Sequence, residues 1–392
     1  MPILQKTPRT ILITGARAPV ALHLARLFHH AGDRVVLADT PAHPIAAASK
    51  ACSTYHRLPP PRFELGSYAK AVSKVLKEER IDVVVPTCEE VFYLGQIWRD
   101  QAMIAPLFAP RMDLLMRVHN KHDFIRVAAS LGLATPHTTL LQSQDDLEAM
   151  RSKSHELVFK PVWSRFASHV LLRPRPKALS RVFPTVDAPW VAQEFIDGDE
   201  ISVYAVAVRG DIKAFCAYAS IYRAGKGAGV CFRPVSDTAA RSFVQAFVSA
   251  TNWTGQISFD LMRTKDGDIL PLECNPRATS GVHFFTKPEG FATAFFNDGA
   301  EILPDFAGAQ GVKLAVLLFG LPQALKTGEM GKFSACLREI TELLEWPNDS
   351  GPRKAQVRAL REIASTAIRQ RISLQKASTR DIEWNGPYQS SR

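Results

Sequence analysis

The chain has 392 residues, of which 46% are hydrophobic and 22% are charged, and its formal net charge is +10. These values are ordinary for a soluble enzyme of two or three domains, and they exclude collagen, coiled coil and extensive disorder. The positive charge favours anionic partners such as nucleotides and acidic substrates. The basic residues are scattered, with no arginine-rich block and no basic and aromatic run, so we expect no nucleic-acid partner.

The cysteine spacing, the N-terminal sequence and the length of the apolar runs indicate the cellular compartment. No two cysteines stand at CxxC spacing and no histidine cluster accompanies them, which argues against zinc and against a disulfide framework. Buried thiols in a reducing cytosol are the simpler interpretation. No signal peptide is visible and no apolar run is long enough to cross a bilayer. We therefore expect a cytoplasmic protein without a membrane partner.

Residues 1–118 are predicted to form a Rossmann-like α/β domain. Near-continuous apolar runs, typical of parallel strands covered on both faces, alternate with segments of helical spacing. Strands are expected at 9–15, 34–39 and 81–86, and helices at 20–31 and 68–80. This alternation indicates a doubly wound parallel sheet.

After His119 the pattern changes to an α+β region with antiparallel sheets. Helices are predicted over 121–132 and 236–252, and strands over 156–162, 169–173, 189–196, 200–208, 211–219, 255–262 and 269–275. We assign 119–195 to a lid subdomain and 196–310 to a second subdomain. Residues 311–392 are expected to be a basic helical extension with a break at 346–354.

The hairpin 255–275 carries the strongest chemical pattern. Asp260 lies on its first strand, and Glu273 and Asn275 lie on one face of its second, because strand side chains alternate. A tight turn would place Asp260 beside them. Three oxygen-bearing side chains suit Mg²⁺ rather than zinc. Arg277 adds a guanidinium able to grip an anion. The alternative is a solvated face on an edge hairpin.

This hairpin resembles the metal-binding hairpin of the ATP-grasp superfamily, which includes carbamoyl-phosphate synthetase, biotin carboxylase and D-alanine–D-alanine ligase. The match continues in order through the chain. Asn120-Lys121-His-Asp-Phe resembles the segment of the family's first nucleotide lysine, Val158-Phe-Lys160-Pro resembles that of the second, and 191–200 resembles the hinge strand that holds adenine. The resemblance covers roughly residues 9–300 and implies a Rossmann-like domain followed by two α+β subdomains that clasp ATP.

The resemblance also implies cofactors and roles. ATP and two Mg²⁺ ions are expected, with Mn²⁺ able to replace them, and Asp260, Glu273 and Asn275 would hold the metal. Lys121 and Lys160 would contact the phosphates, and Lys160 and Arg277 would be the catalytic residues. The expected adenine and ribose contacts are Gln193, Glu194, Phe195, Ile196, Glu200, Met262 and Leu272.

The loop after the second lysine departs from the family pattern. It reads Val162-Trp-Ser-Arg-Phe-Ala-Ser168 and has no glycine for a backbone phosphate cradle. We expect the side chains of Ser164, Arg165 and Ser168 to clamp the phosphates instead, because a guanidinium fork matches phosphate oxygens. An impaired lid is the alternative.

The implied activity is that of an ADP-forming carboxylate–amine ligase. An amino acid or small organic acid would be phosphorylated to an acyl phosphate and passed to an amine, giving an amide or peptide bond. Candidate substrate contacts are Arg233, Arg277, Ser280 and His283, and an ordinary buried histidine is the alternative for His283. The expected partners are these small molecules, and a homodimer is compatible with the sequence.

Two other functions compete with the ligase. A Rossmann oxidoreductase using NAD(P) is suggested by Thr14-Gly15-Ala-Arg-Ala-Pro-Val-Ala21 and by Asp39, at the position of a ribose-binding acid. A dinucleotide turn needs several glycines, however, and only Gly15 is present. A non-catalytic ATP-binding regulatory protein would explain the unusual lid loop. Retention of all three metal ligands argues against it.

Overall fold

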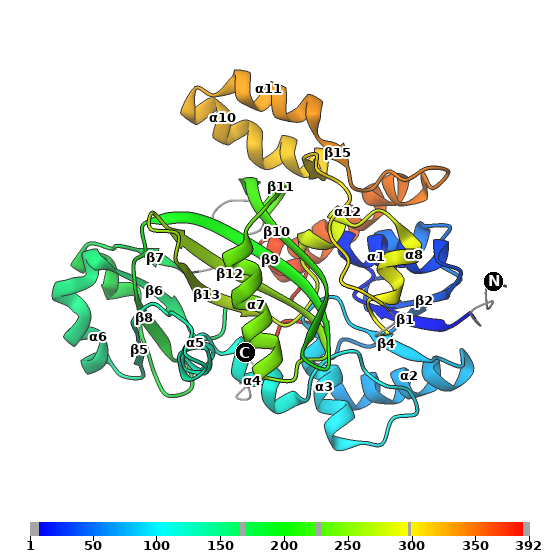
Figure 1. Cartoon of the computed structure of the whole chain (residues 1–392), viewed down its shortest axis with the longest axis horizontal. Helices are drawn as coiled ribbons and strands as arrows, with labels where there is room; N and C mark the ends of the chain where they lie inside the picture. The colour runs from blue at the N-terminus through cyan, green and yellow to red at the C-terminus, as the bar shows by residue number, and fades with distance from the viewer. Residues whose placement is uncertain (1–7, 165–168, 224–228, 297–298, 387–392) are drawn as a thin grey trace.

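The computed structural model describes residues 8–164, 169–223, 229–296 and 299–386, and it contains three sheets (Figure 1). One sheet is parallel and lies in the first part of the chain, a small antiparallel sheet follows, and a large sheet forms the centre. The predicted fold class, an α/β domain followed by two α+β regions and a helical C-terminal region, is confirmed.

The first sheet is a doubly wound parallel sheet of order β3-β2-β1-β4. Its elements are β1 (Thr10–Thr14), α1 (Pro19–His30), β2 (Arg34–Asp39), β3 (Thr54–Arg57), α2 (Leu65–Glu78), β4 (Val83–Val85) and α3 (Glu90–Asp100). The apolar strands β1, β2 and β4 are almost wholly buried, as both-face coverage requires. Strand β3 escaped prediction because it is only partly buried and reads Thr-Tyr-His-Arg. Strand order reverses between β1 and β4, so the switch point lies there.

The second sheet is antiparallel, with order β5-β8-β6-β7. Its elements are β5 (Thr138–Leu141), α6 (Gln144–Met150), β6 (Leu157–Pro161), β7 (Leu171–Leu172) and β8 (Trp190–Glu194). Two helices, α4 (Met112–His119) and α5 (Lys121–Ser130), lead into it and meet at Asn120. The Asn120 side chain accepts hydrogen bonds from the N–H groups of His122 and Asp123, which caps α5 and fixes where Lys121 begins it.

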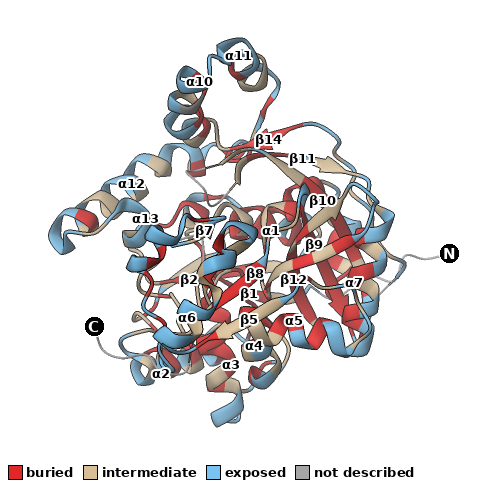
Figure 2. Ribbon diagram, turned by 90° about the vertical axis from the view of Figure 1, so that its left-hand side faces the viewer, coloured by how far each residue is buried: buried red, intermediate tan, exposed pale blue. Residues whose placement is uncertain are grey.

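The central sheet has seven strands in the order β13-β12-β9-β10-β11-β14-β15. These are β9 (Gly198–Val208), β10 (Asp211–Arg223), β11 (Gly229–Val235), β12 (Gly255–Thr264), β13 (Ile269–Asn275), β14 (Gln310–Gly311) and β15 (Thr341–Glu342). Helix α7 (Thr238–Ala250) packs on one face, through residues such as Phe243 and Phe247. The 3-10 turn η4 (Ser280–Phe284) and helix α8 (Pro288–Thr293) pack on the other face. Much of β9, β10 and β12 is buried, although β9 begins with three exposed residues (Figure 2).

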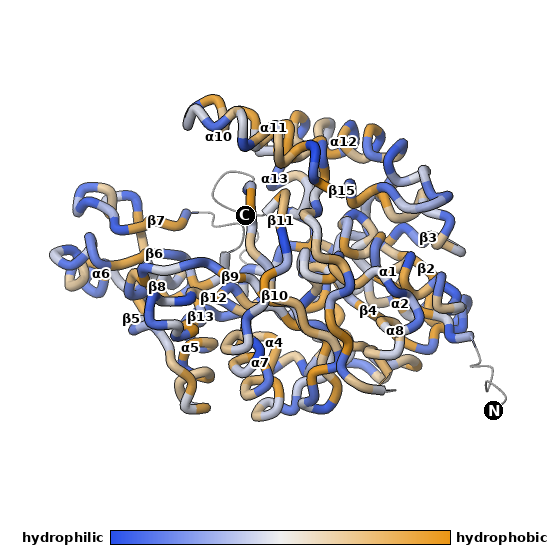
Figure 3. Tube along the Cα trace, turned by 45° about the horizontal axis from the view of Figure 1, so that its top comes forward, coloured by the Kyte–Doolittle hydropathy of each residue, from blue (hydrophilic) through white to orange (hydrophobic). Residues whose placement is uncertain are grey.

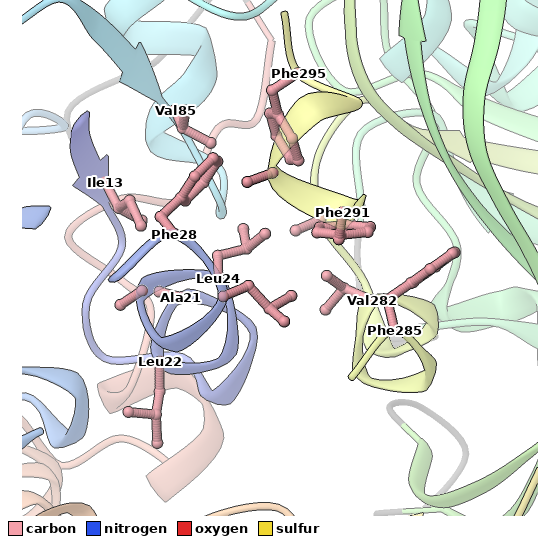
Figure 4. Close-up of a cluster of buried hydrophobic side chains, with 14 of the residues drawn as sticks. Ile13, Ala21, Leu22, Leu24, Phe28, Val85, Val282, Phe285, Phe291 and Phe295 are labelled. Atoms are coloured by element: carbon pink, nitrogen blue, oxygen red, sulfur yellow. The ribbon is translucent and has the colours of Figure 1, made fainter. Parts of the chain in front are cut away.

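One hydrophobic cluster joins the first domain to the central sheet. Leu24 and Phe28 of α1 face Val282, Phe291 and Phe295, which follow the β12–β13 hairpin (Figure 4). The ring centroids of Phe28 and Phe295 lie 5.0 Å apart in an edge-to-face arrangement. Because the cluster is continuous, the first domain and the candidate metal hairpin are held in one packed unit.

The C-terminal region is mainly helical, as predicted, but it also adds a strand to the central sheet. Its helices are α9 (Lys313–Ala315), η5 (Val316–Gly320), α10 (Leu321–Thr327), α11 (Met330–Glu339), α12 (Gly351–Gln370) and α13 (Leu374–Ala377). Helices α10 and α11 project from the body (Figure 1). Hydrophobic and hydrophilic positions alternate around α10, α11 and α12 (Figure 3). The expected break precedes α12, which begins at Gly351.

A buried ion pair anchors this region to the first domain. The Arg26 side chain is 1% exposed, and its Nε donates to Asp349 Oδ2 over 2.9 Å. Its two other nitrogens donate to the carbonyls of Leu343 and Leu344. Asp349 also accepts from the Ser49 hydroxyl at 2.6 Å. A buried charge pair is costly to separate when both partners are fully hydrogen-bonded.

We predict that Asp349→Asn will lower the free energy of unfolding by about 3 kcal/mol, because it leaves the Arg26 charge buried without a counter-ion. Urea unfolding followed by circular dichroism measures this. Lys74→Ala, which breaks an exposed pair with Glu78, is the control and should cost less than about 0.5 kcal/mol. Equal stability of the two variants would show that the anchor contributes nothing.

Candidate functional site

The β12–β13 hairpin brings three oxygen-bearing side chains together. Asp260 pairs directly with Glu273 across the hairpin, and the register shifts by one residue beyond that pair. The Asn275 side-chain nitrogen lies 3.5 Å from an oxygen of each carboxylate. The connecting turn contains Gly267 at φ +90°, a conformation that glycine adopts without a Cβ clash. The side-by-side arrangement expected from the sequence is therefore present.

Two buried lysines face this hairpin from the lid side. Lys121 Nζ lies 3.3 Å from Glu273 Oε2 and donates to the Ser164 carbonyl over 2.7 Å. Lys160 Nζ donates to Gln193 Oε1 at 2.9 Å and to the Leu272 carbonyl at 3.0 Å. Both lysines are at most 6% exposed. Buried ammonium groups need paired anions or acceptors, so this region is organised around charge.

The carboxylates and lysines of the site shift one another's pKa values. Burial, followed by the charge of Glu273, raises the pKa of Asp260 to about 7. Burial alone would also raise the pKa of Glu273, but the charges of Lys121 and Lys160 outweigh it and hold that pKa low, at about 2. Burial lowers the pKa of Lys160 to about 8, although Glu273 opposes the shift. Perturbed groups of this kind gather where a protein binds or transfers charge.

Two of the predicted nucleotide contacts lie on the same face as Asp260. Met262 follows Asp260 by two residues on β12, and Glu200 pairs with Met262 across β9. The Glu200 carboxylate accepts from Arg223 over 2.6 Å. Leu272 lies beside the hairpin bulge, and its carbonyl accepts from Lys160.

The predicted hinge strand is β8 and the residues after it. Gln193 is 1% exposed and joins Lys160 to the Thr138 hydroxyl. The N–H of Glu194 donates to the His137 carbonyl, and the N–H of Phe195 donates to the Glu156 carbonyl. Among the described residues, the N–H of Ile196 has no such partner. Of the hinge N–H groups, Ile196 is thus the one available to a ligand.

Arg277 begins the segment that leaves the hairpin. Its guanidinium donates to Asn275 Oδ1 and to the Ala278 carbonyl, each at 3.2 Å. Burial lowers the pKa of the nearby His119 to about 4 and raises that of Cys88 to about 12, and the Arg277 charge acts downward on both. Arg277 therefore lies between the β12–β13 hairpin and the first domain. Ser280, three residues on, begins η4 and is partly exposed.

Two predicted substrate contacts do not join the site. Arg233 of β11 pairs with Ala219 of β10, which places it on the face of the sheet opposite Asp260, and its guanidinium lies 3.6 Å from Glu339. His283 is 1% exposed, stacks on Phe232 and meets His23 edge to face. The packed-histidine interpretation of His283 is therefore the correct one, and Arg233 belongs to the outer face of the sheet.

The predicted phosphate clamp is described only in part. Arg165 and Ser168 lie outside the described residues. The Ser164 hydroxyl donates to the Pro161 carbonyl at 3.2 Å, and its own carbonyl receives Lys121. In the described residues, Ser164 therefore contributes its backbone rather than its side chain to the surroundings of Lys121.

Sequence reasoning missed several residues at this site. The Ser202 hydroxyl donates to Asp260 Oδ1 over 2.7 Å, and pairing of β9 with β12 is the signal that could have found it. His119 and Trp163 contact each other beside Lys121, with ring centroids 5.6 Å apart. Trp384, near the end of the chain, lies next to them. Nothing local in the sequence indicates that last contact.

Comparisons with known proteins agree with this geometry. Residues 118–281 match the family model of the ATP-grasp domain. The fold is similar to that of an L-amino acid ligase from Bacillus licheniformis, at 19% identity over 74% of this chain and 75% of that one, with a TM-score of 0.58. It is also similar to an N5-carboxyaminoimidazole synthetase from Staphylococcus aureus, at 12% identity over 82% and 87%, with a TM-score of 0.64.

A third similar structure is the biotin carboxylase domain of a 2-oxoglutarate carboxylase from Hydrogenobacter thermophilus, crystallised as a dimer with ADP, its magnesium salt and bicarbonate. It is 10% identical over 78% of this chain and 74% of that one, with a TM-score of 0.60. The sequence comparison with curated proteins finds no match. Residues 118–281 form an ATP-grasp domain, and the resemblance predicted from the sequence is confirmed over this part of the chain.

The dehydrogenase alternative is not supported. Asp39, the candidate ribose acid, is 4% exposed, and Arg17 holds it through a 2.6 Å ion pair. Asp381 of the C-terminal segment binds the same guanidinium at 2.6 Å. The chain's own residues thus occupy the position where a dinucleotide ribose would bind. In the part of the chain that the structure describes, no helix combines the length and apolarity needed to cross a membrane.

We predict that His283→Phe will reduce the acid sensitivity of the fold. Burial lowers the pKa of His23 to about 4 and that of His283 well below its usual value of about 6.5. Below pH 6.5 these two histidines are protonated in the unfolded chain but remain neutral in the folded one. The free energy of unfolding therefore decreases as pH falls. The loss between pH 7.5 and 5.0 should shrink by about 1–2 kcal/mol in the variant.

Urea unfolding at the two pH values measures this loss, and His43→Phe, at an exposed position, is the control. A wild-type pH dependence in His283→Phe would contradict the packed, uncharged state of His283.

Proposed function

We propose that this protein is an ADP-forming ligase that activates a carboxylic acid with ATP and transfers the acyl group to an amine. The observation that carries the proposal is the meeting of Asp260, Glu273 and Asn275 with Lys121 and Lys160, within the residues that match the ATP-grasp domain. Ligation of amino acids by a protein of similar fold supports a carboxylate as first substrate. The acid is an amino acid or a small organic acid, and the acceptor is an amine.

The side chains of the hairpin fit magnesium. Two carboxylates and an amide oxygen are hard ligands, and partial burial together with mutual repulsion raises the pKa of Asp260. A divalent cation between the carboxylates would remove that cost. In the described ranges no three His, Cys, Asp or Glu residues converge on one metal position, so the third protein ligand would be Asn275. The similar carboxylase domain was crystallised with magnesium and ADP. Magnesium, when bound, would neutralise charge on the terminal phosphates of ATP.

The chain's own groups would perform the remaining work. Lys121 and Lys160 would exchange their present acceptors, which include Glu273, for phosphate oxygens. Met262, Leu272 and the Ile196 N–H would hold the adenine, and Glu200 would accept from the ribose. Arg277 would orient the substrate carboxylate toward the γ-phosphorus. A carboxylate oxygen forms the new bond to phosphorus as the bond to ADP breaks.

In the second step the amine nitrogen attacks the acyl carbon. The bond from that carbon to the phosphate oxygen breaks, phosphate leaves, and the amine loses a proton to phosphate or water. The two steps consume ATP and yield ADP, phosphate and an amide. Exclusion of water protects the acyl phosphate between the steps.

The proposal also includes the cellular compartment and the oligomeric state. All six cysteines are free, which suits a reducing cytoplasm. We propose a homodimer as the assembly, because the similar carboxylase domain was crystallised as a dimer. Size-exclusion chromatography with light scattering tests this assembly.

The reaction is tested with a panel of amino acids and organic acids, by ADP release and by trapping with hydroxylamine. We expect substrate-dependent ADP and phosphate, and a hydroxamate from the acyl phosphate. Formation of AMP and pyrophosphate would instead indicate an acyl adenylate and overturn the mechanism.

We predict that Glu273→Gln will lower kcat by roughly 10²-fold or more, because it removes one of two carboxylates near the transferring phosphate. The change preserves side-chain volume, so circular dichroism should match the wild type. Glu289→Gln, an exposed position on α8, is the matched control and should keep full activity. Near-normal turnover of Glu273→Gln at saturating Mg²⁺ would place the metal elsewhere.

A further inference from the structure

The last described residues form a strap, Ser378–Gly386, that follows α13 and crosses the first domain. Asp381 receives two hydrogen bonds from Arg17, at 2.7 and 2.6 Å. Arg62 donates to the Glu383 carboxylate over 2.6 Å, and its own backbone N–H donates to the Asp381 carbonyl over 3.1 Å. The strap is therefore fixed by charged and backbone contacts rather than lying loosely on the surface.

The strap covers the switch point of the parallel sheet. Arg17 belongs to the turn after β1, and Glu89 and Tyr93 belong to the segment after β4. Tyr93 donates to the Glu383 carbonyl at 2.6 Å, and the Trp384 N–H donates to Glu89 at 3.0 Å. The strap is thus bonded to the loops on both sides of the crevice where open α/β sheets bind ligands.

Trp384 is the packed residue of the strap. It is 7% exposed, stacks on Phe92 with centroids 5.8 Å apart, and meets Tyr93 edge to face at 5.0 Å. Its indole nitrogen has no hydrogen-bond partner among the described residues. The ring therefore acts through packing alone, and phenylalanine can replace much of that packing.

The strap also reaches the residues that flank the first phosphate lysine. The ring centroids of Phe92 and His119 lie 4.5 Å apart, and those of His119 and Trp163 lie 5.6 Å apart. Gly386 approaches Trp163 so closely that a Cβ on residue 386 would lie 2.7 Å from the indole nitrogen. Beyond His119 and Trp163 come Lys121 and Ser164, whose Nζ and carbonyl are hydrogen-bonded.

We propose that Trp384 is a positioning residue for Lys121. The strap supports His119, two residues before Lys121, and Trp163, one residue before the Ser164 carbonyl that receives Lys121. The strap thereby holds the start of α5 and the segment that ends in the Ser164 carbonyl, and these two segments fix where the Lys121 ammonium group lies. The C-terminal extension thereby contributes to the nucleotide site without touching the nucleotide. The role assigned to Lys121 rests on the proposed function.

The test compares Trp384→Ala, Trp384→Phe and Trp346→Ala with the wild type, by calorimetric titration of ADP in the presence of Mg²⁺. Trp346 is a half-buried indole that packs on His30, away from the strap, and controls for the general loss of a tryptophan. We expect Trp384→Ala to weaken ADP binding about tenfold. Trp384→Phe should stay within about twofold of the wild type, and so should Trp346→Ala.

Hydrogen exchange of residues 119–124 is measured on the same proteins, because it reports the packing around Lys121 whether or not nucleotide binds. We expect exchange there to be about tenfold faster in Trp384→Ala and unchanged in Trp346→Ala. Unchanged exchange in Trp384→Ala overturns the positioning role. So does a loss of ADP affinity that Trp346→Ala shares. Failure of the wild type to bind ADP would instead reject the proposed function. The exchange result would still show whether the strap positions the segment around Lys121.

Discussion

The ion pair between Lys121 and Glu273 is the contact on which the arrangement of the site depends. It joins the first turn of α5 to the second strand of the hairpin over 3.3 Å; the Lys121 side chain is buried and that of Glu273 is half-buried. Burial favours the neutral form of Glu273, but the charges of Lys121 and Lys160 outweigh it and hold the pKa of this carboxyl low. A buried charge must have a partner. A bound phosphate would pair with Lys121, and a bound cation would pair with Glu273. The ion pair therefore holds one positive and one negative group where both ligands would need them.

The sequence predicted the hairpin well, because its constraints are local. A period of two fixes which side chains share a face, and a short turn with glycine fixes which residues pair. Asp260, Glu273 and Asn275 therefore had to converge once both strands formed. The parallel sheet was predictable for a similar reason, since continuous apolar runs such as Thr10–Thr14 leave little choice but a strand covered on both faces.

Contacts between distant segments were beyond sequence reasoning. Arg233 follows a glycine-rich stretch, but which face it occupies depends on the register of β11 against β10, where the pairing shifts twice. His283 lies six residues after Arg277, yet η4 turns it into the packing between the sheet and α1. Neither outcome is encoded in a local pattern. Trp384 reaches His119 across more than 260 residues of chain, and only the folded first domain supplies its contacts.

The strap also pairs with polar groups at the crevice of the Rossmann-like domain. A crevice at a switch point exposes strand ends and unpaired loop groups, and some partner must satisfy them. Here Asp381 and the backbone near Glu383 supply the acceptors that a ribose and its phosphates would otherwise provide to Arg17 and Tyr93. These contacts join the strap and the first domain into one support. Because the strap is held on that support and ends against Trp163, the rigidity of the domain extends to the base of the lid.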